Sequence, residues 1–410
     1  MKRFLRAVLP AFLLAVSVGQ IYAFTNFSSE IADYIGRSQK DVQWAFSFGI
    51  FFLGMGAAFF GKIVERNIRV STMIGTALFL SGLLVTEVGV IVKSLPLLYI
   101  GYGLLVGLGT GIIYISPVKT MMLWFPEHKA IAAALPIISF GLGSTLSTVL
   151  FNGIRWGSDL SVAAFRLRGF MDYGITRVFI AFATFYAVPM VAASFLLKKP
   201  TLEQQSFGHG IPQLEFSYRS LFATPFFWQA WGFMLLNISC GLCLIPLAKQ
   251  MMNTPEVYGG CPELITWIIA LCGIMNGGGR FFFAWWSDRL ARRIDILLLI
   301  LAISIGVMVA SFVPVLIGLA LLVINACYGA GFSVIPAILA DHYGMTNISK
   351  IHGAVLSAWG FAGLIGNQLA ILVSDRLGLG SIGVVAMLVA LYSVNFMNVC
   401  ALRRRVVTGR

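Results

Sequence analysis

The chain has 410 residues, of which 59% are hydrophobic and only 11% are charged. Soluble globular domains are typically about 45–50% apolar and about 25% charged, so this composition excludes an ordinary soluble enzyme. It also excludes a disordered chain and a coiled coil, both of which are rich in charged and polar residues. A helix that crosses a membrane needs roughly 20 mainly apolar residues, and the chain has enough for about twelve of them. The composition therefore predicts a polytopic membrane protein.

The formal net charge of +13 does not indicate binding of nucleic acid. A surface that binds nucleic acid is a contiguous basic face, whereas the Lys and Arg residues here form short clusters between apolar runs. Such clusters are typical of the cytoplasmic loops of a membrane protein. The six cysteines and four histidines show no metal-ligand spacing and no disulfide framework, so we expect no metal and no cofactor.

Apolar runs separated by turn and charge signals predict twelve membrane-spanning helices. Their expected ranges are 5–28, 42–61, 70–92, 96–118, 131–152, 175–197, 222–248, 263–284, 294–314, 317–340, 351–373 and 381–402. The first apolar run has no small-x-small cleavage site, so we expect an uncleaved first span rather than a signal peptide.

A polar segment at 198–220, which contains Pro200 and Pro212, divides the chain almost in half. We interpret it as a cytoplasmic linker between an N-terminal six-helix bundle at 1–197 and a C-terminal six-helix bundle at 221–410. With both termini cytoplasmic, the inner loops carry roughly twice as many Lys and Arg residues as the outer loops. We expect an integral protein of the cytoplasmic (inner) membrane, present in the lipid as a monomer.

A short motif of the form acid-Arg-x-x-Arg recurs at matching positions of the two halves, after the second and the eighth expected spans. Its charged residues are Glu65, Arg66 and Arg69 in the first copy and Asp288, Arg289 and Arg292 in the second. A carboxylate and arginines at helix ends can bridge to neighbouring helices and hold one of two rocking states. The duplication indicates two parallel halves, and it makes ordinary loop charges the weaker interpretation.

The duplicated motif resembles the signature of the major facilitator superfamily. That resemblance implies an all-α membrane fold, with twelve transmembrane helices in two pseudo-symmetric six-helix bundles. Other segments are similar to the oxalate/formate antiporter family and to the related monocarboxylate porters. These segments are 19–24, 114–117, 124–130, 139–144 and 276–280. The resemblance covers nearly the whole chain and implies transport of a small organic anion.

Arg280 lies within an apolar run, between three glycines and three phenylalanines. An arginine near the centre of a membrane helix costs roughly 2.5–3.5 kcal/mol, so function is the default interpretation. Its guanidinium stays protonated and presents a planar pair of donors that fits a carboxylate. The alternatives are that the side chain snorkels to the nearby inner face or pairs with a structural acid. The resemblance favours a functional role, because the family's substrate-binding arginine falls at this position.

Two positions depart from the pattern of these families. Asn276, one helical turn before Arg280, stands where proton-coupled monocarboxylate porters commonly carry an acidic residue. Trp359 stands where oxalate exchangers carry a lysine in the eleventh span. One cation in place of two favours a monoanion such as formate, lactate or pyruvate over oxalate.

Four further residues complete the expected substrate pocket. Tyr22 and Gln20 lie in the first span, Tyr114 in the fourth and Asn325 in the tenth. Transporter sites form near the bilayer midplane, where hydroxyl and amide groups can bond a carboxylate. Packing or interhelical hydrogen bonding is the competing interpretation for each of them.

Three other charged residues lie within the expected spans or at their ends. Glu87 in the third span and Glu30 at the outer end of the first are the candidate proton carriers, although Glu87 could simply reach water. Lys119, near the inner end of the fourth span, is expected to snorkel to the cytoplasmic face.

The expected function is secondary active transport of a small organic anion by alternating access, coupled to a proton or a counter-anion. A dicarboxylate exchanger of the oxalate type is the alternative within the same class. A polytopic membrane enzyme or a non-transporting sensor is the alternative of another class. An enzyme would need a nucleophile with its base, or a cluster of His and Asp at one interface, and the sequence indicates neither.

Overall fold

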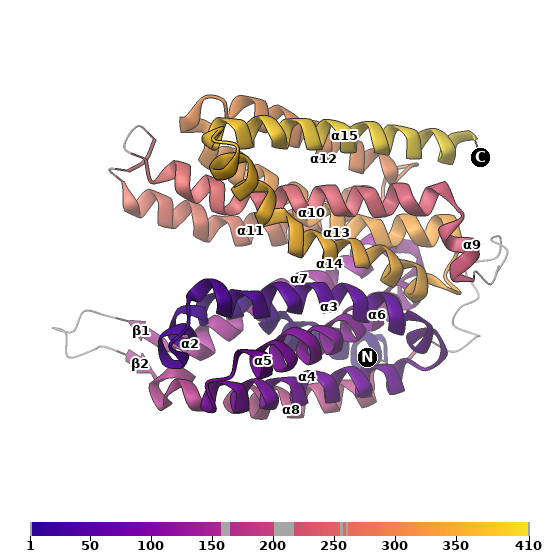
Figure 1. Cartoon of the computed structure of the whole chain (residues 1–410). Helices are drawn as coiled ribbons and strands as arrows, with labels where there is room; N and C mark the ends of the chain where they lie inside the picture. The colour runs from indigo at the N-terminus through magenta and orange to yellow at the C-terminus, as the bar shows by residue number, and fades with distance from the viewer. Residues whose placement is uncertain (1, 157–164, 201–216, 255–256, 260, 409–410) are drawn as a thin grey trace.

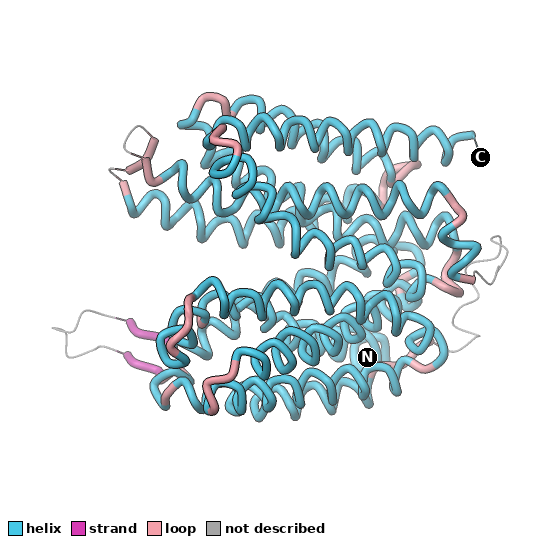
Figure 2. The backbone as a smooth tube through the Cα atoms, viewed as in Figure 1, coloured by secondary structure: helices cyan, strands magenta, loops and turns pink. Residues whose placement is uncertain are grey.

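The computed structural model of the chain describes residues 2–156, 165–200, 217–254, 257–259 and 261–408. Nearly all of these residues are helical, as the tube drawing makes plain (Figure 2). The one β element among them is a hairpin of two three-residue strands, in which Ile154 pairs with Leu167.

The N-terminal half contains eight α-helices of very different length, joined in places by 3-10 and π segments (Figure 1). Its elements are η1 Phe4–Val8, α1 Leu9–Val18, η2 Gly19–Asn26, α2 Ser28–Ile35, α3 Gln39–Arg66, α4 Ile68–Ile91, α5 Leu95–Leu98, η3 Tyr99–Val106, α6 Gly107–Trp124, η4 Pro126–His128, α7 Lys129–Asn152, β1 Ile154–Trp156, β2 Phe165–Leu167, η5 Phe170–Tyr173, η6 Ile175–Arg177 and α8 Val178–Leu196. The C-terminal half has α9 Tyr218–Phe222, α10 Pro225–Met252, α11 Pro262–Ser287, α12 Ile294–Ala310, η8 Pro314–Leu316, α13 Ile317–Tyr343, α14 Ile348–Ile371, η9 Leu372–Arg376 and α15 Gly380–Thr408.

Every one of the twelve expected spans corresponds to an apolar helical segment. Within the described residues, 11 helical segments are long and apolar enough to cross a membrane, and α12, with 17 residues, is a shorter apolar helix. The protein is therefore an integral, multi-pass membrane protein with the all-α fold that the sequence predicts. Most of the expected linker lies outside the described residues, which resume at Ser217 and soon form the short helix α9.

The sequence predicts that the first copy of the duplicated motif lies in a loop between two spans. In the structure this copy is helical. Glu65 and Arg66 form the last turn of α3, five residues beyond the expected end, because Lys, Glu and Arg are good helix formers. Asn67 ends that helix and caps the next, since its side chain accepts a hydrogen bond from the backbone N–H of Val70 at 3.1 Å. Asp288 directly follows α11.

The helices form two bundles that meet along a few elements (Figure 1). We call the end of the molecule that carries Glu65 and Asp288 the motif end, and the opposite end, which carries β1 and β2, the hairpin end. Between the bundles, α3 packs against α14, and α7 packs against α11 and α13. Together with a smaller contact between α6 and α14, these are the main helix pairs that join the two halves.

Glycines set the distance between α3 and α14. A Cβ at Gly54 would lie 2.8 Å from the backbone nitrogen of Gly360, and one at Gly353 would lie 2.0 Å from the carbonyl oxygen of Ala57. Real side chains do not approach backbone atoms so closely, so this crossing requires residues without a Cβ. Small residues give membrane helices the same close approach in the absence of a hydrophobic driving force.

Replacing Gly353 by alanine is expected to separate α3 from α14. The test is a distance measurement between spin labels at Lys62 and Thr346, in a background without the six native cysteines. The label distance is expected to increase in Gly353→Ala, because the methyl group would overlap Ala57. Gly306→Ala is the matched control, since a Cβ at Gly306 meets nothing within 4 Å. An unchanged distance in Gly353→Ala would show that this contact does not limit the approach of the halves.

Candidate functional site

Arg280 lies in α11 where this helix faces α7 of the other half and α13 of its own. Its residue is 7% exposed, and its Nη1 donates to the backbone carbonyl of Ile137 in α7 at 2.5 Å. The guanidinium carbon lies 5.6 Å from the ring centroid of Phe332 in α13. This placement disagrees with the snorkelling alternative, because the guanidinium is directed into the protein. No carboxylate pairs with Arg280 among the residues that the structure describes.

An aromatic cage surrounds the same region; we use this name for Tyr22, Tyr114, Phe140, Phe332 and Trp359. Trp359 in α14 is its centre, with ring centroids 5.4 Å from Tyr114, 5.9 Å from Phe140, 4.8 Å from Phe332 and 6.2 Å from Tyr22. The cage draws residues from both halves: η2, α6 and α7 on one side, and α13 and α14 on the other. Because the set spans both halves, its geometry changes whenever the halves move relative to each other.

The charge of Arg280 acts on the cage directly. It lies within electrostatic range of the phenol groups of Tyr22 and Tyr114, and also of Tyr328 in α13. The three predicted residues Tyr22, Tyr114 and Trp359 are thus brought together with Arg280. Sequence reasoning missed Phe140, Phe332 and Tyr328, because apolar and aromatic residues in a span look the same whether they face a site or lipid.

Three buried polar atoms in this region have no hydrogen-bond partner within the described part of the chain. They are Nε of Arg280, the hydroxyl of Tyr114 and Nε1 of Trp359. Nearly all buried polar groups in proteins are paired, so three unpaired donors near one guanidinium call for an explanation. Each of them can donate a hydrogen bond, and together they match a ligand that only accepts. A carboxylate is such a ligand.

Close backbone contact positions the N-terminal wall of the cage. A Cβ at Gly19 would lie 2.0 Å from the carbonyl oxygen of Phe140, so η2 and α7 cross at the minimum distance. The chain also tightens from an α-helix to a 3-10 helix at Gly19. This crossing carries Tyr22 to Phe140, with ring centroids 5.5 Å apart in an edge-to-face arrangement.

Gln20, Asn276 and Asn325 make contacts of a different kind. Gln20 is fully buried inside the N-terminal bundle, where its Oε1 accepts from the hydroxyl of Tyr102 at 3.3 Å. Nδ2 of Asn276 donates to the backbone carbonyl of Asn325 at 3.3 Å, and Nδ2 of Asn325 donates to that of Leu321 at 2.8 Å. The contacts of Gln20 and Asn276 fit the packing interpretation, in which amides join helices within one half, whereas the contact of Asn325 lies within α13.

The two candidate proton carriers lie apart from the cage. Glu87 is 5% exposed, and its Oε2 accepts from the backbone N–H groups of Phe179 at 2.8 Å and Ile180 at 3.2 Å. It therefore caps the N-terminus of α8, which satisfies orphan donors and a helix dipole, and it does not reach water. Glu30 accepts from the hydroxyl of Ser29 at 2.7 Å, in the first turn of α2.

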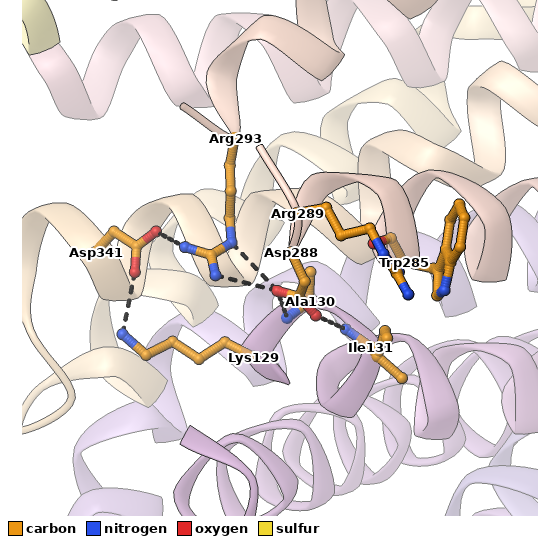
Figure 3. Close-up of polar contacts among 8 residues, drawn as sticks. All are labelled: Lys129, Ala130, Ile131, Trp285, Asp288, Arg289, Arg293 and Asp341. Atoms are coloured by element: carbon orange, nitrogen blue, oxygen red, sulfur yellow. Dashed lines mark hydrogen bonds and ion pairs between the residues drawn. The ribbon is translucent and has the colours of Figure 1, made fainter. Parts of the chain in front are cut away.

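At the motif end, Asp288 joins the C-terminal half to α7 of the N-terminal half (Figure 3). Its two carboxylate oxygens accept from the backbone N–H groups of Ala130 and Ile131, each at 3.0 Å. Arg293 donates to Asp288 at 3.1 Å through Nη2 and forms a second ion pair with Asp341. We call these contacts the Asp288 interlock, and Lys129, which pairs with Asp341 at 3.0 Å, completes it from the other half.

Glu65 makes the corresponding contacts from the N-terminal half to the C-terminal half. Its Oε1 accepts from the backbone N–H of Ser349 at 2.6 Å, at the N-terminus of α14 in the other half. Its Oε2 forms a buried ion pair with Lys119 of α6, and its backbone carbonyl accepts from Lys199 at 2.7 Å. We call this set the Glu65 interlock. Each half thus uses one carboxylate to cap a helix of the other half, where the dipole favours negative charge.

The interlocks use only part of the predicted motif. The arginine that contacts Asp288 is Arg293, whereas Arg289 stacks on Trp285 of its own helix, 3.7 Å from the ring centroid. Arg69 donates to the carbonyl of Phe195 at 3.1 Å, which is a contact within the N-terminal bundle. Arg66 and Arg292 are exposed, and neither has an acidic partner among the described residues.

Lys119 is placed differently from the expectation. Its side chain is 5% exposed and is paired with Glu65, so it does not snorkel to the surface. The physical reason is that Glu65, at the end of the neighbouring helix α3, provides a carboxylate that pairs with the Lys119 ammonium. Lys119 and Arg293 are the cationic partners of the interlocks that the sequence motif did not reveal.

Comparisons with known proteins agree with this architecture. The model of the family described as Major Facilitator Superfamily matches residues 10–367. An uncharacterised MFS-type transporter of Escherichia coli, YhjX, is 23% identical and covers 85% of this chain and 83% of its own. The oxalate:formate antiporter of Oxalobacter formigenes is 24% identical, with 92% of this chain and 86% of that protein covered. Monocarboxylate transporter 12-B of Danio rerio is 24% identical over 71% of this chain and 64% of that protein.

Solved structures with the same fold include two transporters of low sequence identity. A bacterial homologue of the iron transporter ferroportin in an outward-facing state gives a TM-score of 0.68 at 15% identity, over 97% of this chain and 98% of that one. The human organic anion transporter MFSD10 gives 0.67 at 12% identity, over 97% of this chain and 99% of that one. Because the family model spans most of the sequence and the two-bundle architecture agrees with it, the chain belongs to the Major Facilitator Superfamily.

Proposed function

We propose that the protein transports a small monocarboxylate by alternating access, and that Arg280 binds the carboxylate. The observation that carries the proposal is a buried guanidinium without a carboxylate partner, next to further unpaired donors on Tyr114 and Trp359. The names of the relatives support the ligand class, since one is an oxalate:formate antiporter and another a monocarboxylate transporter.

The chemistry of the site favours an anion over a neutral or cationic substrate. A buried charge is costly unless it is paired, and the carbonyl of Ile137 satisfies only one of five guanidinium N–H groups. A carboxylate would accept from the guanidinium in a bidentate manner, and this is stronger than a bond to a neutral carbonyl. The bound substrate would therefore replace the contact with Ile137.

The size and charge of the cage favour a small monoanion. Four ring contacts converge on Trp359, so the surroundings of Arg280 are aromatic and would suit a short apolar substituent beside the carboxylate. A dianion such as oxalate would place a second charge against these rings. The alternative of an oxalate-type exchanger remains the second candidate, because an oxalate:formate antiporter is among the relatives.

The interlocks support alternating access. The contacts of Asp288 and Glu65 lie at the motif end, where the flanking parts of α7 and α14 are buried: Ala134 and Leu356 are both fully buried. Toward the hairpin end the same helices become exposed, with Leu142 at 52% and Phe361 at 42%. This state is closed at the motif end. We propose that the motif end is cytoplasmic, as the charge distribution predicts, and that substrate enters from the other side.

Transport would then require both interlocks to open. We propose that Glu65 and Asp288 are the gating carboxylates and that the units that rock are the bundles at 1–197 and 221–410. Both termini would be cytoplasmic in the inner membrane. Breaking a charge-assisted hydrogen bond costs about 1.5–3 kcal/mol, so each interlock is strong enough to bias the equilibrium and weak enough to open.

Neutralising Arg280 is expected to abolish transport. In proteoliposomes, Arg280→Gln should lower uptake of labelled formate, lactate or pyruvate at least tenfold, because the side chain loses its charge and its planar fork. Uptake by Arg280→Lys should lie between that of the wild type and that of Arg280→Gln, since an ammonium keeps the charge without bidentate geometry. Arg37→Gln, an exposed arginine that follows α2, removes the same charge away from the cage and should transport normally. Wild-type uptake by Arg280→Gln would refute the assignment.

The melting temperature should distinguish mono- from dicarboxylates. A ligand that binds only the folded state at one hundred times its dissociation constant stabilises it by about 2.7 kcal/mol. Formate, acetate, lactate and pyruvate are therefore the ligands expected to raise the melting temperature, and the increase should be absent in Arg280→Gln. A larger increase with oxalate or malonate would instead favour the exchanger.

Removing the charge of Asp288 is expected to open the motif end. A cysteine introduced at Ala134, in a background without native cysteines, lies in the closed contact of α7 with α11 and α13. Asp288→Asn should increase its labelling rate with a water-soluble thiol reagent roughly tenfold or more, the factor that a loss of about 1.4 kcal/mol implies.

The matched control is Asp295→Asn, which breaks an ion pair with Arg403 inside the C-terminal half. This variant should label at the parent rate. Equal rates in Asp288→Asn and Asp295→Asn would show that the Asp288 interlock does not hold the halves closed.

A further inference from the structure

A basic cavity lies at the motif end of the C-terminal half, away from the aromatic cage. It has a volume of about 520 Å³ and is formed by the ends of α10, α12, α13 and α15. Its ionisable lining residues are Arg292, Arg293, Arg405, His342 and Asp341. Three arginines face one carboxylate, so the cavity has an excess of positive charge and favours an anionic occupant.

A second cavity of about 330 Å³ shares Arg292 with the first. Arg403 and Arg404 add further positive charge to it, and Leu298, Cys400 and Val407 form its apolar part. Arg292 therefore lines both basic cavities. Leu298 and Cys400 lie deeper in α12 and α15 than the arginines, so this part of the lining changes from apolar side chains to arginine toward the motif end.

The arginines differ in whether the protein already neutralises them. Arg293 is used by the Asp288 interlock, and Arg403 is paired with Asp295 at 2.6 Å. Neither Arg292 nor Arg405 has an acidic partner among the described residues. These two arginines are the ones that a ligand could use without breaking an existing ion pair.

The position of the cavity identifies the kind of anion. Helix α12 contacts mainly α13 and α15, so it lies at the edge of the bundle, where lipid is the neighbour. Arginines at the ends of such helices are placed to meet the phosphate layer of a membrane, and clusters of this kind attract anionic lipids.

We propose that this cavity binds the phosphate of an anionic phospholipid, with Arg292 and Arg405 as its ligands and the acyl chains lying along α12 and α15. Arginine suits this role because its planar fork bonds two phosphate oxygens at once. The proposal concerns the headgroup layer and does not depend on the identity of the transported substrate.

The test is the binding of dioleoylphosphatidylglycerol to the purified full chain in detergent, measured as bound lipid by native mass spectrometry across a titration. The double variant Arg292→Gln/Arg405→Gln should bind at least tenfold more weakly than the wild type. Arg292→Lys/Arg405→Lys should recover part of the affinity, because it restores the charge without the fork. Both arginines line a cavity and neither is buried in the packed core, so their replacement should leave the core unchanged.

Two comparisons make the result specific. The control variant Lys62→Gln/Arg219→Gln removes the same charge from exposed positions outside both cavities and should bind lipid as the wild type does. Inorganic phosphate and glycerol 3-phosphate should compete only weakly with the lipid for binding, since they lack acyl chains. Unchanged lipid binding in the arginine double variant would overturn the proposal, and so would equal binding of the soluble phosphates and the lipid.

Discussion

The central feature of the structure is the buried guanidinium of Arg280, a positive charge that has no carboxylate partner among the described residues. Arg280 donates to a neutral group, the backbone carbonyl of Ile137, which belongs to the opposite half. In a medium of low dielectric such a contact is stronger than in water, yet it leaves most of the guanidinium unsatisfied. Under the proposed function, the same bond would tie substrate binding to the relative position of the halves, because a carboxylate that displaced Ile137 would also remove a contact between them.

The interlocks solve a related problem at the motif end. Glu65 and Asp288 sit opposite helix N-termini of the other half, where backbone N–H groups and the dipole provide an anion site without a dedicated cation. Lys119 and Arg293 then neutralise the carboxylates from within their own halves. Because backbone donors are fixed in place, the contact forms only when the halves are in register. This property suits a two-state switch better than a pair of flexible side chains does.

Much of this could be predicted from the sequence, for identifiable physical reasons. The spans followed from apolar length, and Arg280 followed from the rarity of an unpaired charge within such a run. The structure brings Tyr22, Tyr114 and Trp359 together, and their role in binding substrate stays a prediction. Helix ends were less predictable: α3 extends to Arg66 because charged residues are helix formers as well as loop formers.

The remaining differences concern partners that no single segment reveals. Asn276 donates to the backbone of α13, Asn325 donates to Leu321 of its own helix, and Glu87 caps α8, because polar groups at membrane depth bond to the nearest backbone donor or acceptor. Arg293 replaced Arg289 and Arg292 as the partner of Asp288, since the turn after α11 decides which side chain points inward.

The most direct measurement is a structure of the protein with a bound monocarboxylate, determined in the state closed at the motif end. The account predicts carboxylate oxygens within hydrogen-bond distance of the Arg280 guanidinium and of Tyr114 or Trp359, with the contact to Ile137 lost. An anion bound elsewhere, with Arg280 still on Ile137 or paired with a protein carboxylate, would contradict it.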